Sequence, residues 1–197
     1  MYKRTFQIIL LLAVFLLSVP ASAQEEYKEE PITNKQVLEG IKLFRQGNLE
    51  GALALLEKEA KASPQDPDVF NAIGIIHSQT KNYEEALKYF DKAIPLKKGN
   101  FKTMYNKLNL LVSMGRLEDA KAMLKNMTVE YPNHATGWVN YGAILMQSGA
   151  KEEALKCFEK AISIKSDDFD AHFKKGQVLM LQKKYNEAKT SFEASLK

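Results

Sequence analysis

Small and bulky apolar positions recur along most of this chain with one fixed period. Five alanines are spaced by 34 residues without a gap, and a bulky apolar residue lies four positions after each of them. The alanines are Ala52, Ala86, Ala120, Ala154 and Ala188, and the bulky residues are Leu56, Phe90, Leu124, Phe158 and Phe192. Self-similarity at a period of roughly 20–50 residues predicts an array of stacked structural repeats.

Each period predicts two amphipathic helices joined by a short turn. In residues 67–100, the apolar residues Phe70, Ile73 and Ile76 have helical spacing, and a second amphipathic stretch covers residues 83–96. Lys81 and Asn82 fall between the two stretches, where a helix ends and a left-handed residue is favoured. Nothing after the first 23 residues requires a strand, so the pattern predicts an all-α fold.

The fourth period shows the residue pattern most clearly. It carries bulky and small residues at fixed places, namely Trp138, Gly142, Leu145, Ala154, Phe158 and Ala161. This pattern resembles the tetratricopeptide repeat family, whose unit is also about 34 residues long. The resemblance implies a right-handed α-solenoid of stacked antiparallel helix pairs. The five predicted repeats are residues 33–66, 67–100, 101–134, 135–168 and 169–197.

The repeats are expected to pack closely where their side chains are small. We expect Gly142 to face Ala154 across the helix pair of the fourth repeat. The third repeat departs from the pattern, because Lys107 and Leu108 replace an apolar and a small residue, and Met127 replaces a small one. Either its first helix is rotated by about one residue, which brings Leu108 inward, or its two helices stand further apart. We favour the rotation and keep a hinge as the alternative.

The N-terminal segment has the three parts of a secretory signal peptide. Lys3 and Arg4 precede an apolar run over residues 8–19, and Ala21 and Ala23 supply the small-residue cleavage pattern. We therefore predict a signal peptide over residues 1–23, cleaved before Gln24, with an uncleaved membrane anchor as the alternative. Residues 24–32 are predicted to form a flexible lead-in. The leader predicts export to the periplasm, or else secretion or display at the cell surface, without a stable membrane span after cleavage.

The charge balance does not point to a polyanionic partner. The whole chain carries 28 Lys and Arg against 24 Asp and Glu, a formal net charge of +4, and two of the basic residues belong to the leader. The remaining lysine pairs are scattered and lack the interleaved aromatic residues that stack on bases. We therefore expect no binding of nucleic acid.

The residues that could carry chemistry are dispersed along the chain. His77, His134, His172 and Cys157 have no metal-ligand spacing, and one cysteine cannot close an intramolecular disulfide. The aspartates around Asp168 fall where a helix start needs a polar cap. Because no nucleotide-binding, serine-hydrolase or zinc-protease motif is present, we predict a non-enzymatic protein without cofactor or metal.

A second stripe on the first helix of each repeat is the candidate binding surface. It lies opposite the core stripe and is apolar with interspersed amides, including Asn140, and the family resemblance places it along a concave groove that holds a peptide or helix. The alternative is that neighbouring first helices simply pack together and bury it. The predicted groove residues are Val37, Ile41, Phe44, Asn71, Ile75, Tyr105, Asn109, Val112, Val139, Ala143, Met146, Phe173, Gln177 and Met180.

The groove predicts a protein-interaction scaffold of the cell envelope whose partner is another protein. Val37 stands where a lysine would begin the family's carboxylate clamp, so we do not expect recognition of chaperone tails by that mode. The alternative function is a self-assembling component. In that case copies associate through the C-terminal end near Phe192 and Leu196, where the sequence has no extra polar helix.

Overall fold

The computed structural model describes residues 31–196. The predicted signal peptide, residues 1–23, and nearly all of the predicted lead-in, residues 24–32, lie outside the described residues. No helix in residues 31–196 is both long and apolar enough to cross a membrane.

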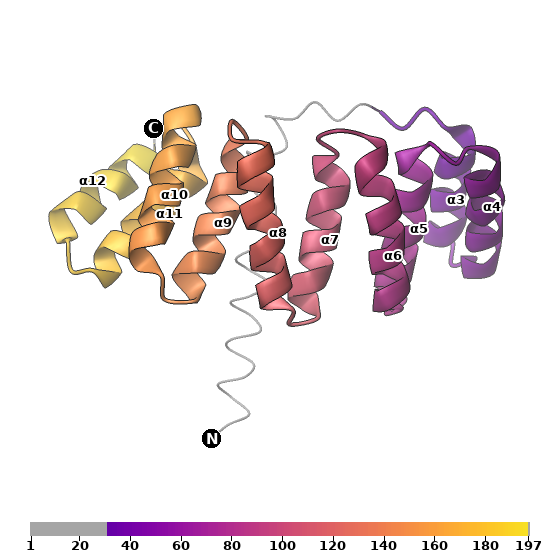
Figure 1. The fold of residues 1–197 in the computed structure, drawn as a ribbon, viewed down its shortest axis with the longest axis horizontal. Coiled ribbons are helices and arrows are strands. Elements are labelled where there is room, and N and C mark those ends of the chain that lie inside the picture. Colours follow the sequence, from indigo (N-terminus) through magenta and orange to yellow (C-terminus); the bar gives the residue numbers. More distant parts are fainter. Residues whose placement is uncertain (1–30, 197) are drawn as a thin grey trace, which may run out of the picture. The chain divides into compact units, whose positions relative to one another are not determined.

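The described residues fold into helices only (Figure 1). They divide into two compact units whose boundary in the sequence lies between Gly115 and Arg116. We call residues 31–115 the N-terminal unit and residues 116–196 the C-terminal unit. The N-terminal unit contains α3 (Lys35–Arg45), α4 (Leu49–Ala62), α5 (Pro67–Gln79), α6 (Tyr83–Ala93), the short 3₁₀ helix η1 (Ile94–Leu96) and α7 (Phe101–Ser113). The C-terminal unit contains α8 (Leu117–Glu130), α9 (Ala135–Gln147), α10 (Lys151–Ile164), α11 (Phe169–Leu181) and α12 (Tyr185–Ser195).

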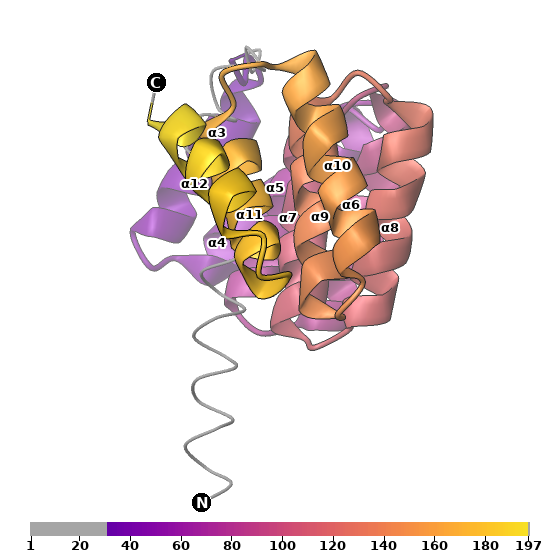
Figure 2. The same cartoon turned by 90° about the vertical axis from the view of Figure 1, so that its left-hand side faces the viewer.

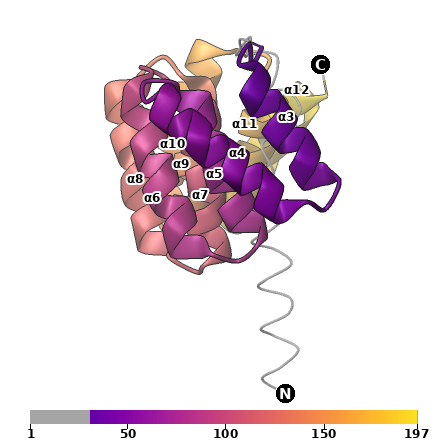
Figure 3. The same cartoon turned by 90° about the vertical axis from the view of Figure 1, so that its right-hand side faces the viewer.

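Within each unit, consecutive helices form antiparallel pairs that stack on the next pair. In the N-terminal unit α3 pairs with α4 and α5 with α6 (Figure 3). In the C-terminal unit α9 pairs with α10 and α11 with α12 (Figure 2). The predicted all-α fold built from stacked helix pairs is therefore confirmed.

Short polar side chains begin several of these helices. Asn34 Oδ1 accepts hydrogen bonds from the backbone N–H groups of Gln36 and Val37, and Asn100 Oδ1 accepts one from Thr103. Asp168 Oδ1 accepts the N–H of Ala171 at 2.8 Å. Such bonds satisfy amide groups that have no partner inside the helix, so Asp168 is a helix cap, as predicted.

The turn between the two helices of each repeat contains one residue in the left-handed region. Gly47, Gly115 and Gly149 occupy this place with φ between 73° and 84°. Lys81 and Lys183 occupy the equivalent place with φ of 64° and 62°, although a side chain is disfavoured there. In the second repeat the left-handed residue is thus Lys81 and not the neighbouring Asn82.

Four of the five repeats contain a glycine against which a bulky side chain packs directly. A Cβ atom placed on Gly142 would lie 2.7 Å from Cε1 of Phe158, and the next nearest atoms also belong to Phe158 and Cys157. The nearest neighbour of Gly142 is therefore the ring of Phe158, four residues after Ala154 on the second helix, and the facing of Gly142 and Ala154 stays a prediction. Gly40, Gly74 and Gly176 meet Leu56, Phe90 and Phe192 in the same way.

The third repeat has Leu108 in place of this glycine, and Leu108 is completely buried. Lys107 extends sideways to α6, where its ammonium pairs with the carboxylate of Asp91. The helix rotation itself stays a prediction. The sequence boundary between the two compact units falls in this same repeat, after α7.

Candidate functional site

The predicted groove residues fall into two groups by exposure. Five of them are buried, and none of the five has more than 8% of its surface exposed: Val37, Asn71, Tyr105, Val139 and Ala143. Their burial corresponds to the alternative in which neighbouring helices cover part of the stripe. The residues that retain exposed surface are Ile41, Phe44, Ile75, Asn109, Val112, Met146, Phe173, Gln177 and Met180.

In the N-terminal unit, the exposed part of the stripe borders a cavity of about 310 Å³ between α5 and α7. Ile75 and Asn109, both predicted groove residues, line it together. This volume lies at the lower end of the range of roughly 300–1,000 Å³ that ligand pockets occupy. The remaining lining residues are Ser78, Gln79, Phe90, Asn106, Leu110 and Ser113. We call this cavity the α5–α7 pocket.

Asparagine amides supply the polar groups of the α5–α7 pocket. The Asn106 amide donates from Nδ2 to Oδ1 of the buried Asn71 at 2.9 Å, which fixes the orientation of its side chain. Within residues 31–196, the amide oxygen of Asn106 and the whole amide of Asn109 have no hydrogen-bond partner. An extended peptide has backbone N–H and C=O groups that could bond to these amides.

Asn106 was not among the predicted groove residues. The predicted stripe includes Tyr105 but not Asn106, which directly follows it. The structure shows that Tyr105 is buried whereas Asn106 reaches the pocket. The sequence signal for Asn106 is its spacing, because it follows the predicted groove residue Asn71 by 35 positions.

In the C-terminal unit, the exposed part of the stripe consists of Met146, Phe173, Gln177 and Met180, of which Phe173 is aromatic. Phe173 is 38% exposed, stacks on Phe169 with ring centroids 5.7 Å apart, and meets the ring of Phe192 at 5.5 Å. Asn140 is only 5% exposed. Met180 is 46% exposed and lies further along α11. This surface offers apolar contact area and few free amides.

The histidines and the cysteine lie apart, and no group of three or more possible metal ligands occurs in residues 31–196. His77 stacks on Tyr89 at 5.5 Å, and the His172 ring is 2.9 Å from the carbonyl oxygen of Ser166. Burial raises the pKa of Cys157 to about 11, so the reactive thiolate is scarce at neutral pH. His77 and His172 thus contact neighbouring groups of the fold, and Cys157 is buried in it.

His134, which precedes α9, should make the protein less stable in acid. Burial lowers the pKa of His134 to about 4, whereas an unfolded histidine has a pKa near 6.5. The unfolded chain therefore binds a proton that the folded chain does not, so stability is complete above pH 6.5 and falls as the pH drops toward 4. With allowance for partial exposure, the loss is about 1 kcal/mol.

This prediction can be measured by urea unfolding followed through Trp138 fluorescence, because Trp138 is the only tryptophan and lies in α9. The His134→Gln variant should lose less stability between pH 7 and pH 4 than the parent. An equal loss in both proteins would contradict the assignment to His134.

The repeated glycine contacts, the stacked helix pairs and the left-handed turns define a helical repeat protein. Family comparison agrees, since two models described as "Tetratricopeptide repeat" match residues 37–101 and 79–141. A third, described as "TPR repeat", matches residues 142–183. The chain belongs to the tetratricopeptide repeat family.

Curated relatives share the repeat region. Peroxisome biogenesis protein 5 of Arabidopsis thaliana is 27% identical over 168 residues, which is 79% of this chain and 21% of that protein. Protein O-mannosyl-transferase TMTC3 of Mus musculus is 23% identical over 169 residues, or 78% of this chain and 18% of that protein. The aligned part of this chain thus spans about a fifth of the length of these relatives.

Solved structures show the same fold at low sequence identity. YrrB, described as a TPR protein with an unusual peptide-binding site, is 22% identical with a TM-score of 0.60, covering 91% of this chain and 92% of YrrB. MamA from Desulfovibrio magneticus RS-1 is 20% identical with a TM-score of 0.63, covering 83% of this chain and 94% of MamA. At such identity the likeness concerns the fold.

Proposed function

We propose that this protein is a non-enzymatic interaction scaffold whose first helices bind a peptide or helical segment of a partner protein. The α5–α7 pocket is the observation that carries the proposal. Its apolar floor, formed by Ile75 and Leu110, can receive a side chain. The amides of Asn106 and Asn109 can bond the backbone of the same segment. Because the amides stand on packed helices, binding requires little ordering of the scaffold.

We also propose that the scaffold acts in the cell envelope. The support is the leader pattern of residues 1–23, with its basic start, apolar run and small residues before Gln24. Cleavage there would release a repeat protein into the periplasm or beyond the cell. N-terminal sequencing of the protein recovered from its host tests the cleavage, and a retained Met1 would contradict it.

Partner capture through the α5–α7 pocket can be tested by photo-crosslinking. A photoreactive amino acid at Asn109, which is exposed, should capture the partner in living cells. Tyr105 is a poor position for this probe or for a charged substitution, because it is only 8% exposed and a change there would disturb folding. The captured protein is identified by mass spectrometry, and its affinity for the purified scaffold is then measured.

The decisive comparison uses pairs of amide substitutions. Each lost hydrogen bond costs about 1 kcal/mol, so Asn106→Ala combined with Asn109→Ala should weaken the partner's affinity by about tenfold or more. Gln36→Ala combined with Gln46→Ala removes one exposed amide on α3 and one directly after it, and should leave the affinity unchanged. Equal affinities for the two double variants would refute the proposed role of the pocket.

A further inference from the structure

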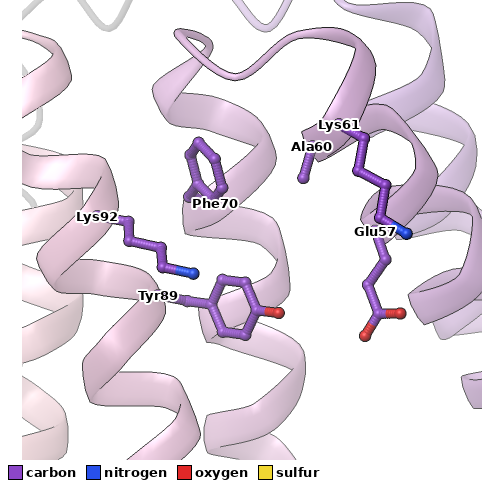
Figure 4. A pocket seen from close by; sticks show the side chains of 6 residues that line it. All are labelled: Glu57, Ala60, Lys61, Phe70, Tyr89 and Lys92. Atoms are coloured by element: carbon purple, nitrogen blue, oxygen red, sulfur yellow. The ribbon is translucent and has the colours of Figure 1, made fainter.

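The N-terminal unit has a second cleft, which involves none of the predicted groove residues (Figure 4). It has a volume of about 560 Å³ and lies between the second helices α4 and α6, with α5 behind them. It shares no lining residue with the α5–α7 pocket. We call it the α4–α6 cleft. Its lining residues are Glu57, Ala60, Lys61, Phe70, Tyr89 and Lys92.

Aromatic rings form one wall of the α4–α6 cleft. Tyr89 stacks on Phe70 with centroids 6.5 Å apart and on His77 with centroids 5.5 Å apart. The rings come from α5 and α6, so the wall is held by two packed helices. Phe70 is almost buried, whereas Tyr89 is partly exposed and presents the accessible apolar surface. A flat aromatic surface of this kind favours another aromatic or bulky apolar side chain.

Two lysines at the cleft form no direct ion pair within the described residues, although Lys92 acts electrostatically on Glu85. The ammonium of Lys92 lies 5.0 Å from the centre of the Tyr89 ring, and Lys61 extends from α4 on the opposite side (Figure 4). Lys88, on the same helix as Lys92, instead pairs with Glu85 at 2.6 Å. The cleft therefore presents two ammonium groups that lie outside any direct ion pair and can pair with an anion.

Glu57 supplies the one carboxylate of the lining, so the charge along the cleft is not uniform. Its side chain and the Tyr89 hydroxyl extend into the gap from α4 and α6 (Figure 4). The carboxylate suits a backbone N–H of a bound segment and disfavours an acidic side chain at the same spot. An acidic side chain is favoured beside Lys61 and Lys92 instead.

We propose that the α4–α6 cleft is a second binding site, which takes a peptide segment carrying a bulky apolar side chain next to acidic ones. The apolar side chain packs on Tyr89 above Phe70, and the neighbouring carboxylates pair with Lys61 and Lys92. Charge complementarity with the unpaired lysines selects an acidic segment over a basic one. This site is separate from the α5–α7 pocket, so the scaffold can hold two segments.

The test titrates an acetylated and amidated peptide of sequence GSWDDSG into the isotope-labelled protein and follows backbone amide NMR signals. We expect shifts in α4 and α6, and at least about tenfold weaker binding by the variant Lys61→Glu with Lys92→Glu. The matched variant Lys58→Glu with Lys88→Glu changes the same net charge on the same two helices outside the cleft. It should bind the peptide as the parent does.

Two control peptides, GSWKKSG and GSADDSG, separate the acidic and aromatic requirements, and both should bind at least about tenfold more weakly than GSWDDSG. The proposal is overturned if GSWDDSG causes no shifts at α4 and α6 at millimolar concentration, if either control peptide binds equally well, or if both lysine variants lose affinity alike. Replacing Asn106 and Asn109 with alanine should leave this binding unchanged. Failure of the proposal for the α4–α6 cleft can therefore be distinguished from failure of the proposal for the α5–α7 pocket.

Discussion

Replacing Gly142 with alanine is expected to lower the free energy of unfolding by up to about 2 kcal/mol. The added Cβ would lie 2.7 Å from Cε1 of Phe158 and 3.0 Å from Cβ of Cys157. Because Phe158 has no exposed surface, its ring cannot swing aside without disturbing the core. Overpacking of this kind costs about 1–3 kcal/mol, which outweighs the roughly 1 kcal/mol that alanine contributes as a better helix former.

The same helix provides the control for this prediction. A Cβ on Gly137 would meet only the His134 ring, at 3.4 Å, which is an ordinary contact. Gly137→Ala should therefore be neutral or stabilise the protein by up to about 1 kcal/mol. Urea unfolding followed by Trp138 fluorescence measures both variants. Equal shifts of the same sign would show that the contact with Phe158 does not limit the approach of α9 and α10.

Much of the fold follows from the sequence because the constraint repeats. A glycine that must admit a bulky residue from the partner helix recurs every 34 residues at Gly40, Gly74, Gly142 and Gly176, with the third repeat as the exception. Such regularity predicts helix pairs without knowledge of any single contact. The identity of each contact is less predictable, since the nearest neighbour of Gly142 is the large Phe158 ring.

The binding surface is harder to predict because its exposure depends on neighbouring repeats. Periodicity places Asn71, Tyr105 and Asn109 on one helix face, but stacking of α5, α6 and α7 buries the first two and leaves Asn109 exposed. A single-helix pattern contains no information about that stacking. The α4–α6 cleft was missed for a related reason, because Phe70 and Tyr89 have the spacing of ordinary core residues.

Replacing Leu108 with glycine tests whether the third repeat differs from the others in its packing. Four repeats require a glycine at this place, so an unmodified repeat pattern predicts that glycine would be tolerated or even stabilising here. The structure predicts the opposite, because Leu108 is completely buried. Removing a buried leucine side chain costs about 2–5 kcal/mol, and glycine in a helix costs about 1 kcal/mol more than alanine.

Leu108→Gly is therefore expected to destabilise the N-terminal unit by about 3–6 kcal/mol, which would unfold it in a protein of ordinary stability. Leu38→Gly is the matched control, since Leu38 also lies within a helix, α3, but is 49% exposed and should cost only about 1 kcal/mol beyond its small packing loss. Far-UV circular dichroism, together with hydrogen exchange of the backbone N–H groups in helices α5, α6 and α7, measures the loss of stability in both variants. Similar small losses of stability in the two variants would mean that the third repeat can adopt the glycine contact of its neighbours. A large loss confined to Leu108→Gly would mean that leucine at this place is part of the core.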